Sequence, residues 1–326
     1  MKLAASSKSL MALRAPSTIR WPDGKDFAFT VFDDTERGTV ENNRAIYGLL
    51  RDLGMRTTKS IWPVAGPGEV EIPGPTCEDE DYLDMCVQFQ SEGFEIALHN
   101  ATYHTSDRAL TLRGLERFRE LFRHDPHTLA NHSSNREGIY WGAARLSGWR
   151  RLLYELFQSG EKFRGHVEGD PLFWGDLCKE RVRYIRNFTF TDLNTTAVVP
   201  QMPYHDAARP WVNQWFAGSD ARDGFVFNRN VTKSTVDKLV AERGGCLLYT
   251  HFGKDFYENG KLNPQFVKTI EYIASRNGWF VPVATLLDFL ASEQPRPHLL
   301  TCGERSALEN KWLVNQMAGL RHRFSD

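Results

Sequence analysis

The sequence predicts an α/β protein whose strands close into a (β/α) barrel of about seven parallel strands. Short apolar segments without a polar face, the pattern of strands buried on both sides, alternate along the 326 residues with longer segments of helical apolar spacing. Several of the short segments also finish in side chains that can bind or catalyse, as the carboxyl ends of barrel strands do. An open doubly wound sheet is the structural alternative.

The predicted strands are short apolar runs that end in polar or turn residues. The first, Phe27 to Phe32, is aromatic and β-branched and is followed at once by two carboxylates, Asp33 and Asp34. Adjacent like charges repel, so this pair must be exposed or neutralised by a cation or a shared proton. Strands are predicted at residues 27–32, 55–64, 94–98, 128–131, 182–187, 246–250 and 280–283.

The predicted helices have apolar residues at spacings of three and four. In the first, Ile46, Leu49, Leu50 and Leu53 share one face, and Gly54 supplies the C-terminal stop. Helices are predicted at residues 41–53, 77–91, 105–122, 143–157, 172–181, 232–242, 264–276 and 285–290.

The domain organisation is predicted from the absence of a linker. Residues 1–22 are expected to form a leader, and residues 23–326 a single catalytic barrel domain. The stretch near 188–230 lacks regular periodicity but is too apolar for disorder, so we expect an ordered, irregular insertion there.

Composition excludes several classes of function. With 40 basic and 41 acidic residues, the composition does not indicate a polyanion-binding surface, so nucleic acid is not an expected partner. No strand is followed by a nucleotide-binding glycine motif. The five cysteines form no CxxC pair, which suits a reducing compartment. No apolar run is long enough to span a membrane, so a cytoplasmic protein is predicted. Its oligomeric state is not indicated.

A metal site is predicted from two strand ends. Phe94 to Leu98 ends in His99, and His104 follows within one loop. Together with Asp34 at the end of the first strand, these residues have the composition of a site of two histidines and one carboxylate. Because five residues along a helix rotate a side chain by roughly 140°, His99 and His104 can share an ion only if His99 ends the strand.

The predicted chemistry is hydrolysis. A divalent ion, most simply zinc, would keep open positions for water and substrate, and its bound water would lose a proton near neutrality. Asp33, adjacent to the ligand, is predicted as general base, and His251, at the end of a distant strand, as general acid. The alternative is that each of these residues is an ordinary hydrogen-bonded structural residue.

These residues resemble a known family. TVFDD at 30–34, the two histidines after the third strand, and LLYTH at 247–251 are similar, in order, to motifs of the polysaccharide deacetylases, which contain a NodB-homology domain. The resemblance implies a distorted (β/α) barrel and metal-dependent removal of N-acetyl groups from amino sugars. It also implies Asp33 as base, His251 as acid, and the ligand set Asp34, His99 and His104.

The chain departs from the family pattern in three places. Four residues separate His99 from His104, where the family usually has three, and Phe252 follows the acid where the family usually has Asp. The segment from Arg136 to Gly142 is a loose counterpart of the family's third motif, which makes Arg136 the candidate for orienting the base. Four residues of this region are predicted to contact substrate: His132, Asn135, Tyr140 and Trp141.

The leading functional prediction is a metal-dependent hydrolase that removes N-acetyl groups from an amino-sugar-containing glycan or glycan precursor. Aromatic residues make up 12% of the chain, and aromatic platforms for sugar rings are common in glycan-active clefts. The altered histidine spacing supports an alternative, metal-independent hydrolysis of a small amide or cyclic ureide. A third prediction is a carbohydrate-binding protein without turnover.

Overall fold

Seven parallel strands close into a barrel, as the sequence predicts. The computed structural model describes residues 19–68, 72–157 and 163–323. Each barrel strand pairs in parallel with the next, and β8 pairs with both β7 and β1 to close the ring. The barrel strands are β1 (Phe27–Asp33), β2 (Thr58–Ile61), β3 (Glu95–Leu98), β4 (Thr128–Leu129), β5 (Tyr184–Phe190), β7 (Gln214–Asp220) and β8 (Gly245–Thr250).

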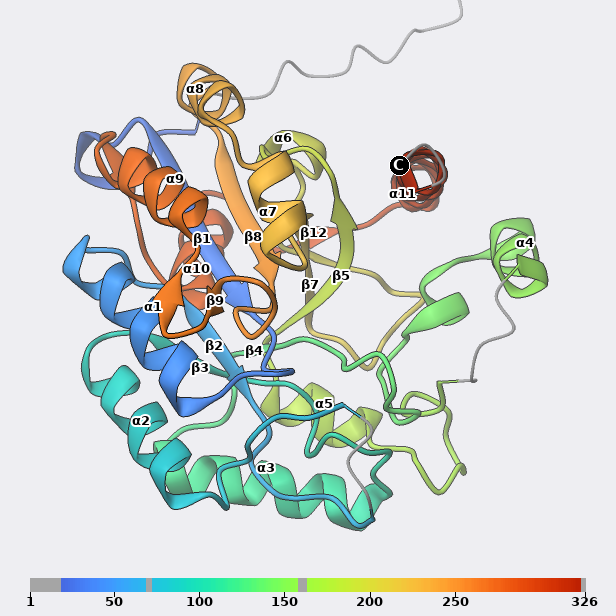
Figure 1. Cartoon of the computed structure of the whole chain (residues 1–326). Coiled ribbons are helices and arrows are strands. Elements are labelled where there is room, and N and C mark those ends of the chain that lie inside the picture. The colour runs from blue at the N-terminus through green and yellow to red at the C-terminus, as the bar shows by residue number, and fades with distance from the viewer. Residues whose placement is uncertain (1–18, 69–71, 158–162, 324–326) are drawn as a thin grey trace, which may run out of the picture.

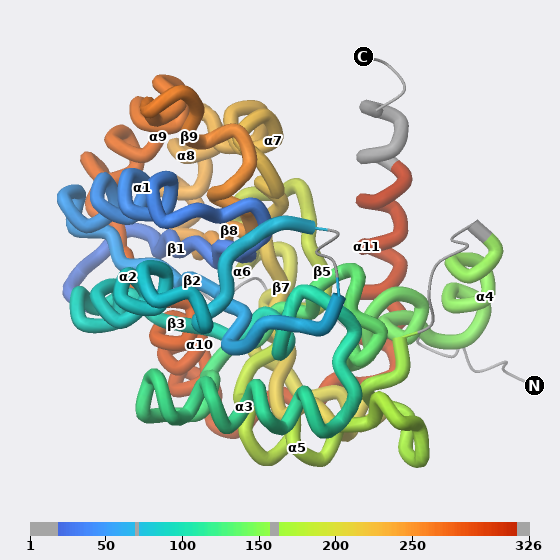
Figure 2. Tube along the Cα trace, turned by 60° about the horizontal axis from the view of Figure 1, so that its bottom comes forward, coloured from blue at the N-terminus to red at the C-terminus, as the bar shows by residue number. Residues whose placement is uncertain are grey.

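Helices surround this barrel (Figure 1). They are α1 (Val40–Asp52), α2 (Glu80–Ser91), α3 (Arg108–Phe122), α4 (Gly148–Phe157), α5 (Gly175–Arg181), α6 (Thr195–Val198), α7 (Gly224–Asn230), α8 (Lys233–Ala241), α9 (Pro264–Ala274), α10 (Val283–Ser292) and α11 (Cys302–Arg323). Short strands lie beside the barrel or in a hairpin: β6 (Tyr204–His205), β9 (Tyr257–Glu258), β10 (Lys261–Leu262), β11 (Gly278–Trp279) and β12 (His298–Leu299). Figures 1 and 2 both place α4 and α11 on the side opposite α1 and α2.

Strand β1 lies at the centre of the packing. All seven of its residues are buried, and it pairs with β8 over six residues, from Ala28 opposite Gly245 to Asp33 opposite Thr250. Its aromatic side chains belong to one continuous core with residues of α1, α2 and α10. Burying one such side chain stabilises the fold by about 1.5–3 kcal/mol, which fixes where the strand ends and therefore where its carboxylates lie.

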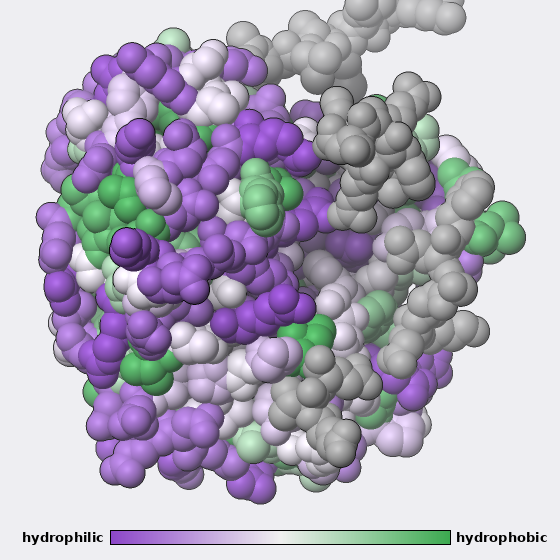
Figure 3. Space-filling model, in the orientation of Figure 1, coloured by the Kyte–Doolittle hydropathy of each residue, from purple (hydrophilic) through white to green (hydrophobic). Residues whose placement is uncertain are grey.

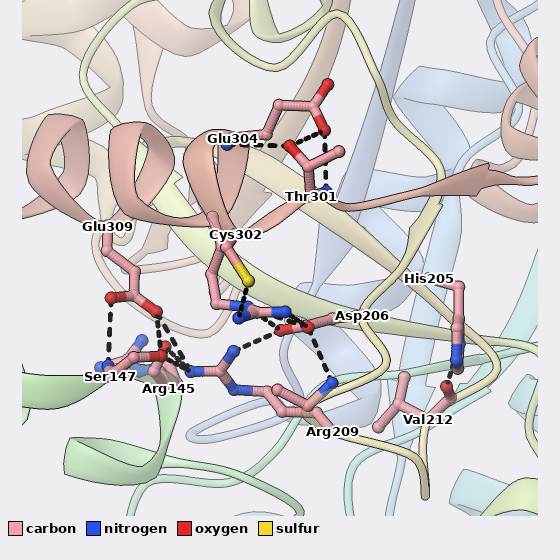
Figure 4. A network of polar contacts seen from close by, with 12 residues as sticks. Arg145, Ser147, His205, Asp206, Arg209, Val212, Thr301, Cys302, Glu304 and Glu309 are labelled. Carbon is pink, nitrogen blue, oxygen red and sulfur yellow. Dashed lines mark hydrogen bonds and ion pairs between the residues drawn. The ribbon is translucent and has the colours of Figure 1, made fainter.

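A network of hydrogen bonds and ion pairs links α11 to the rest of the protein (Figure 4). Asp206, in the segment after β6, pairs with Arg209 and with Arg305 of α11. Arg209 also lies 3.3 Å from Glu309 of α11, whose other contacts include the hydroxyl of Ser147 at 2.8 Å. These carboxylates and Arg209 are buried, and each is paired, which is the condition under which buried charge is tolerated.

Three parts of the predicted fold need correction or lie outside the described chain. The stretch near 188–230 is not an irregular insertion throughout, because it contains the barrel strand β7. The strand predicted at 280–283 lies instead at Gly278–Trp279, where it pairs with β1 beside the barrel, and α10 begins at Val283. Residues 1–18 of the predicted leader lie outside the described residues.

The outer surface in the view of Figure 3 is mostly hydrophilic, with apolar side chains in separate small patches. Among the described residues, no helix combines the length and apolar character needed to span a bilayer.

Candidate metal centre

Glu36 lies at the centre of three imidazoles at the carboxyl end of the barrel. It follows β1 by three residues, and its carboxylate oxygens lie 3.2 Å from Nε2 of His99, 3.2 Å from Nε2 of His251 and 3.6 Å from Nε2 of His132. These histidines follow β3, β8 and β4. Sheet closure therefore brings together side chains that are up to 215 residues apart in the sequence.

Several polar atoms of this group are buried without a hydrogen-bond partner among the described residues. Nε2 of His99 and Oε2 of Glu36 face each other at 3.2 Å without forming a hydrogen bond, and Nδ1 of His99 and Nε2 of His132 form none either within the described chain. Buried polar atoms are nearly always hydrogen-bonded, so a cluster of unpartnered donors and acceptors needs an explanation. A carboxylate facing two imidazole nitrogens is a ligand set that divalent zinc prefers.

The ligand atoms are close enough for one ion. Glu36, His99 and His132 form one group whose ligand atoms all lie within 4.8 Å of one another, and Asp34, Glu36 and His251 form a second. The nitrogen and oxygen donors, their burial and the unpartnered atoms fit a divalent metal ion. The donor atoms of these residues therefore match those of a divalent metal site, and Glu36 belongs to both groups.

Charge within the cluster shifts the pKa values of its members in opposite directions. Burial acts to raise the pKa of Glu36, but the facing His99 and His251 outweigh it and hold the pKa well below its usual value. Burial acts to lower the pKa of His251, but the Glu36 carboxylate outweighs it and raises the pKa. Burial and the nearby His99 lower the pKa of His132 to about 4, so its ring is neutral at pH 7.

Asp33, predicted as the general base, is held in a buried ion pair. Its Oδ2 atom lies 2.9 Å from Nζ of Lys59 and accepts a hydrogen bond of 3.2 Å from the Tyr47 hydroxyl. Its Oδ1 atom accepts a hydrogen bond of 2.8 Å from the backbone N–H of Phe252. Burial raises the pKa of Asp33, although Lys59 opposes the shift. Both oxygens are thus engaged by the protein itself.

Asp34, predicted as a metal ligand, is held by a cation as well. Arg186 of β5 donates to both of its oxygens, at 2.9 and 2.5 Å. The guanidinium lies over the ring of Tyr249 at 4.2 Å, so it is fixed on two sides. Asp34 nevertheless remains close to Glu36 and His251, as a member of the second group.

His104 and Arg136 lie apart from this cluster. His104 is half-buried and belongs to neither group of candidate ligands, although its Nε2 atom is buried without a hydrogen-bond partner among the described residues. The side chain of Arg136 is exposed, whereas Asp33 is 1% exposed and has Lys59 as its cation. The cation beside Asp33 is therefore Lys59, and the histidine that lies in one group with Glu36 and His99 is His132.

The predicted substrate-contacting residues have different surroundings. His132 belongs to the cluster, and Asn135 accepts a hydrogen bond of 2.8 Å from its ring. The ring of Tyr140 packs on His166 with centroids 4.3 Å apart, and burial raises the Tyr140 pKa to about 12. Trp141 lies under the guanidinium of Arg145 at 4.2 Å. The first of these is a ring–ring contact and the second a cation–π contact.

Gly253 allows the loops after β1 and β8 to touch. A methyl group on it would lie 2.3 Å from the carbonyl carbon of Arg37 and 2.5 Å from the amide nitrogen of Gly38, closer than atoms can pack. These loops carry Glu36 and His251. The close approach therefore keeps the backbones that carry these two side chains next to each other.

We expect the substitution Gly253→Ala to push the two loops apart. The free energy of unfolding should fall by about 1–3 kcal/mol, as overpacking does elsewhere, and zinc affinity should weaken. Urea denaturation and a zinc titration measure the two effects. Gly303→Ala is the control, because a methyl group there meets no atom within 4 Å. Equal behaviour of the two variants would contradict the role of Gly253.

Comparisons with known proteins bear on the fold. No protein-family model matches the sequence, and no curated protein does. The PuuE allantoinase structure aligns with a TM-score of 0.50 and 13% identity, over 90% of this chain and 99% of that chain. A protein from Mycobacterium smegmatis assigned as a polysaccharide deacetylase gives 0.49 and 14%, over 88% and 98%. The polysaccharide deacetylase Bc1974 from Bacillus cereus gives 0.34 and 11%, over 79% and 91%.

The similarity to the allantoinase structure supports the barrel fold at 13% identity and assigns no activity. The allantoinase alignment spans nearly the whole of both chains, so the likeness concerns the complete barrel. The fold does not determine the reaction, which depends on the side chains of the cluster around Glu36.

Proposed function

We propose that this chain is a metal-dependent hydrolase that removes N-acetyl groups from an amino-sugar-containing glycan or glycan precursor. The observation that carries the proposal is the buried Glu36 carboxylate, which faces imidazoles from three strand ends whose nitrogens include several without a partner. The substrate class comes from the resemblance of the three motifs to the polysaccharide deacetylases. A cytoplasmic location and an intracellular precursor as substrate belong to the same proposal.

In this proposal the ion is held by Glu36, His99 and His132. This ligand set replaces the predicted set of Asp34, His99 and His104. When bound, a divalent ion polarises the acyl carbonyl and lowers the pKa of water. We expect one ion per chain, although Glu36 belongs to two candidate groups. Arg186 already neutralises Asp34, and its guanidinium would repel a second cation placed beside that carboxylate.

The proton transfers are assigned to Asp34 and His251. Both aspartates are engaged by a cation, Asp33 by Lys59 and Asp34 by Arg186, so occupancy does not decide between them. Asp34 takes the role of general base because it lies in one group with Glu36 and His251, whereas Asp33 belongs to neither group. His251 donates its Nδ1–H to the carbonyl of Arg222 at 2.6 Å, which turns Nε2 toward the centre. Water adds to the acyl carbon and loses a proton to Asp34. The C–N bond then breaks as the leaving amine takes a proton from Nε2 of His251.

The test is acetate release from N-acetylated chito-oligosaccharides. The zinc-loaded protein should release acetate, and treatment with a chelator should abolish the activity, which added zinc should restore. His251→Asn should lower kcat by about 100-fold or more while zinc stoichiometry stays at that of the wild type, because His251 is assigned to proton transfer. Sugar binding without acetate release would instead support the carbohydrate-binding alternative.

A second candidate is metal-independent hydrolysis of a small amide or cyclic ureide. Two observations favour it: the alignment with a structure described as an allantoinase, and the direct contact between Glu36 and His251, which can act as an acid–base pair without an ion. Allantoin hydrolysis that persists in the presence of a chelator would select this candidate over the first.

A further inference from the structure

Asn135 is fixed by three acceptors on one side of its amide. Its Nδ2 group, which carries two hydrogens, lies within hydrogen-bond distance of three acceptors: the carbonyl oxygens of Thr102 and His104, each at 2.8 Å, and Oε1 of Glu137 at 2.6 Å. Since all three atoms are acceptors, the amide nitrogen has to point toward them. Its oxygen therefore points the opposite way, to Nδ1 of His132 at 2.8 Å.

This contact determines which nitrogen of His132 carries the hydrogen. An amide oxygen only accepts, so Nδ1 of His132 has to donate. A neutral imidazole carries one such hydrogen, which leaves a lone pair on Nε2. That atom lies 3.6 Å from Glu36 and has no hydrogen-bond partner in the described part of the chain. It is the nitrogen that a metal would bind.

Two further buried side chains anchor this arrangement. Oε1 of Glu137 also accepts from Nδ2 of Asn100 at 3.0 Å, and its Oε2 accepts from the backbone N–H of Ser106 at 3.1 Å. Asn100 in turn accepts from the backbone N–H of His132 at 2.7 Å. The backbone and the ring of His132 are therefore both tied to the same carboxylate through a pair of asparagines.

We propose that Asn135, anchored by Glu137, is a positioning residue that holds His132 in the tautomer whose Nε2 binds the metal ion. The inference rests on the proposed function and adds to it the residue that orients one metal ligand before the ion binds. It also replaces the prediction of Asn135 as a substrate contact, because the amide is used entirely within the protein. His99 lacks such a partner, since its Nδ1 is unpartnered within the described residues.

The first test compares zinc affinity in two asparagine variants. Asn135→Ala should weaken zinc binding by about 10–100-fold, the usual effect of losing a partner behind a ligand. Asn131→Ala is the matched control: Asn131 is equally buried in the same loop and makes two hydrogen bonds to the backbone of Ile139, but none to His132. Its zinc affinity should equal that of the wild type. Affinity is measured by competition with a zinc-chelating dye.

The second test reads the tautomer directly in the metal-free protein. In ¹⁵N-histidine-labelled protein, the ring resonances of His132 are identified by their loss in His132→Gln. We expect the Nδ1–H form in the wild type and in Asn131→Ala, and a shift toward the Nε2–H form in Asn135→Ala. If Asn135→Ala does not fold, the tautomer of His132 in the wild type alone tests the inference.

Two results would overturn the inference: an Nε2–H tautomer of His132 in the wild type, or equal weakening of zinc binding in both asparagine variants. Failure of the proposed function gives a different pattern. A wild type that binds no zinc, but in which His132 carries its hydrogen on Nδ1, refutes the metal-dependent hydrolase and leaves supported only that Asn135 fixes the tautomer of His132.

Discussion

Replacement of Glu36 by Gln should remove the metal site. Glu36 contributes the carboxylate shared by both candidate ligand groups. Loss of a residue behind a ligand already costs 10–100-fold in affinity, so loss of this direct ligand should weaken zinc binding by more than about 100-fold. A zinc titration followed by metal analysis of the purified variant measures the effect. Acetate release should fall in parallel.

The control for this experiment is the same chemical change at the surface. Glu41→Gln lies on α1, where the carboxylate is exposed and accepts a hydrogen bond of 2.7 Å from the Tyr257 hydroxyl. Its zinc content should equal that of the wild type. Zinc binding by Glu36→Gln with wild-type affinity would return the carboxylate role to Asp34, as the sequence motif predicts.

Much of the fold could be predicted from the sequence, because hydrophobic burial sets it. The run from Phe27 to Phe32 is apolar on both faces, and it forms a strand with both faces buried. Strand β7 was missed because QWFAGSD contains a glycine and polar residues within an irregular region. In the structure the whole of this strand from Trp215 to Asp220 is buried. Its burial comes from neighbours that its own pattern does not reveal.

The site could be predicted only in part, because pairing between distant charges is not visible in a linear pattern. His99 and His251 were found since each directly follows an apolar strand. Glu36 was missed because it lies past the strand end, where a charge is typical of a turn. Arg186 is 152 residues from Asp34, and only barrel closure makes them partners.

Lys59 is the clearest indication in the sequence of an ion pair with the adjacent aspartates. It is a charged residue inside a predicted strand, which is unusual unless a counter-charge lies opposite. The register of β1 and β2 puts Asp33 directly beside Lys59. The adjacent aspartates repel each other and need a nearby cation, which the sequence motif predicts to be a metal ion. Lys59 and Arg186 fill the role instead.

The second large effect is therefore expected at Asp33 and Lys59. Both side chains are 1% exposed, so Asp33→Asn leaves the Lys59 ammonium buried without its counter-charge. Breaking a buried pair in this way typically costs about 3–5 kcal/mol in the free energy of unfolding. Urea denaturation should show this loss. The folded variant should still bind zinc, because Asp33 lies outside both ligand groups.

The double variant separates a structural role from a catalytic one. In Asp33→Asn with Lys59→Met no charge of the pair remains, and replacement of a buried pair by uncharged groups is often close to neutral, so most of the lost stability should return. Acetate release should return with it if Asp33 only supports the fold. A stable double variant that binds zinc but releases no acetate would restore Asp33 as the general base, and Asp34 would lose that assignment.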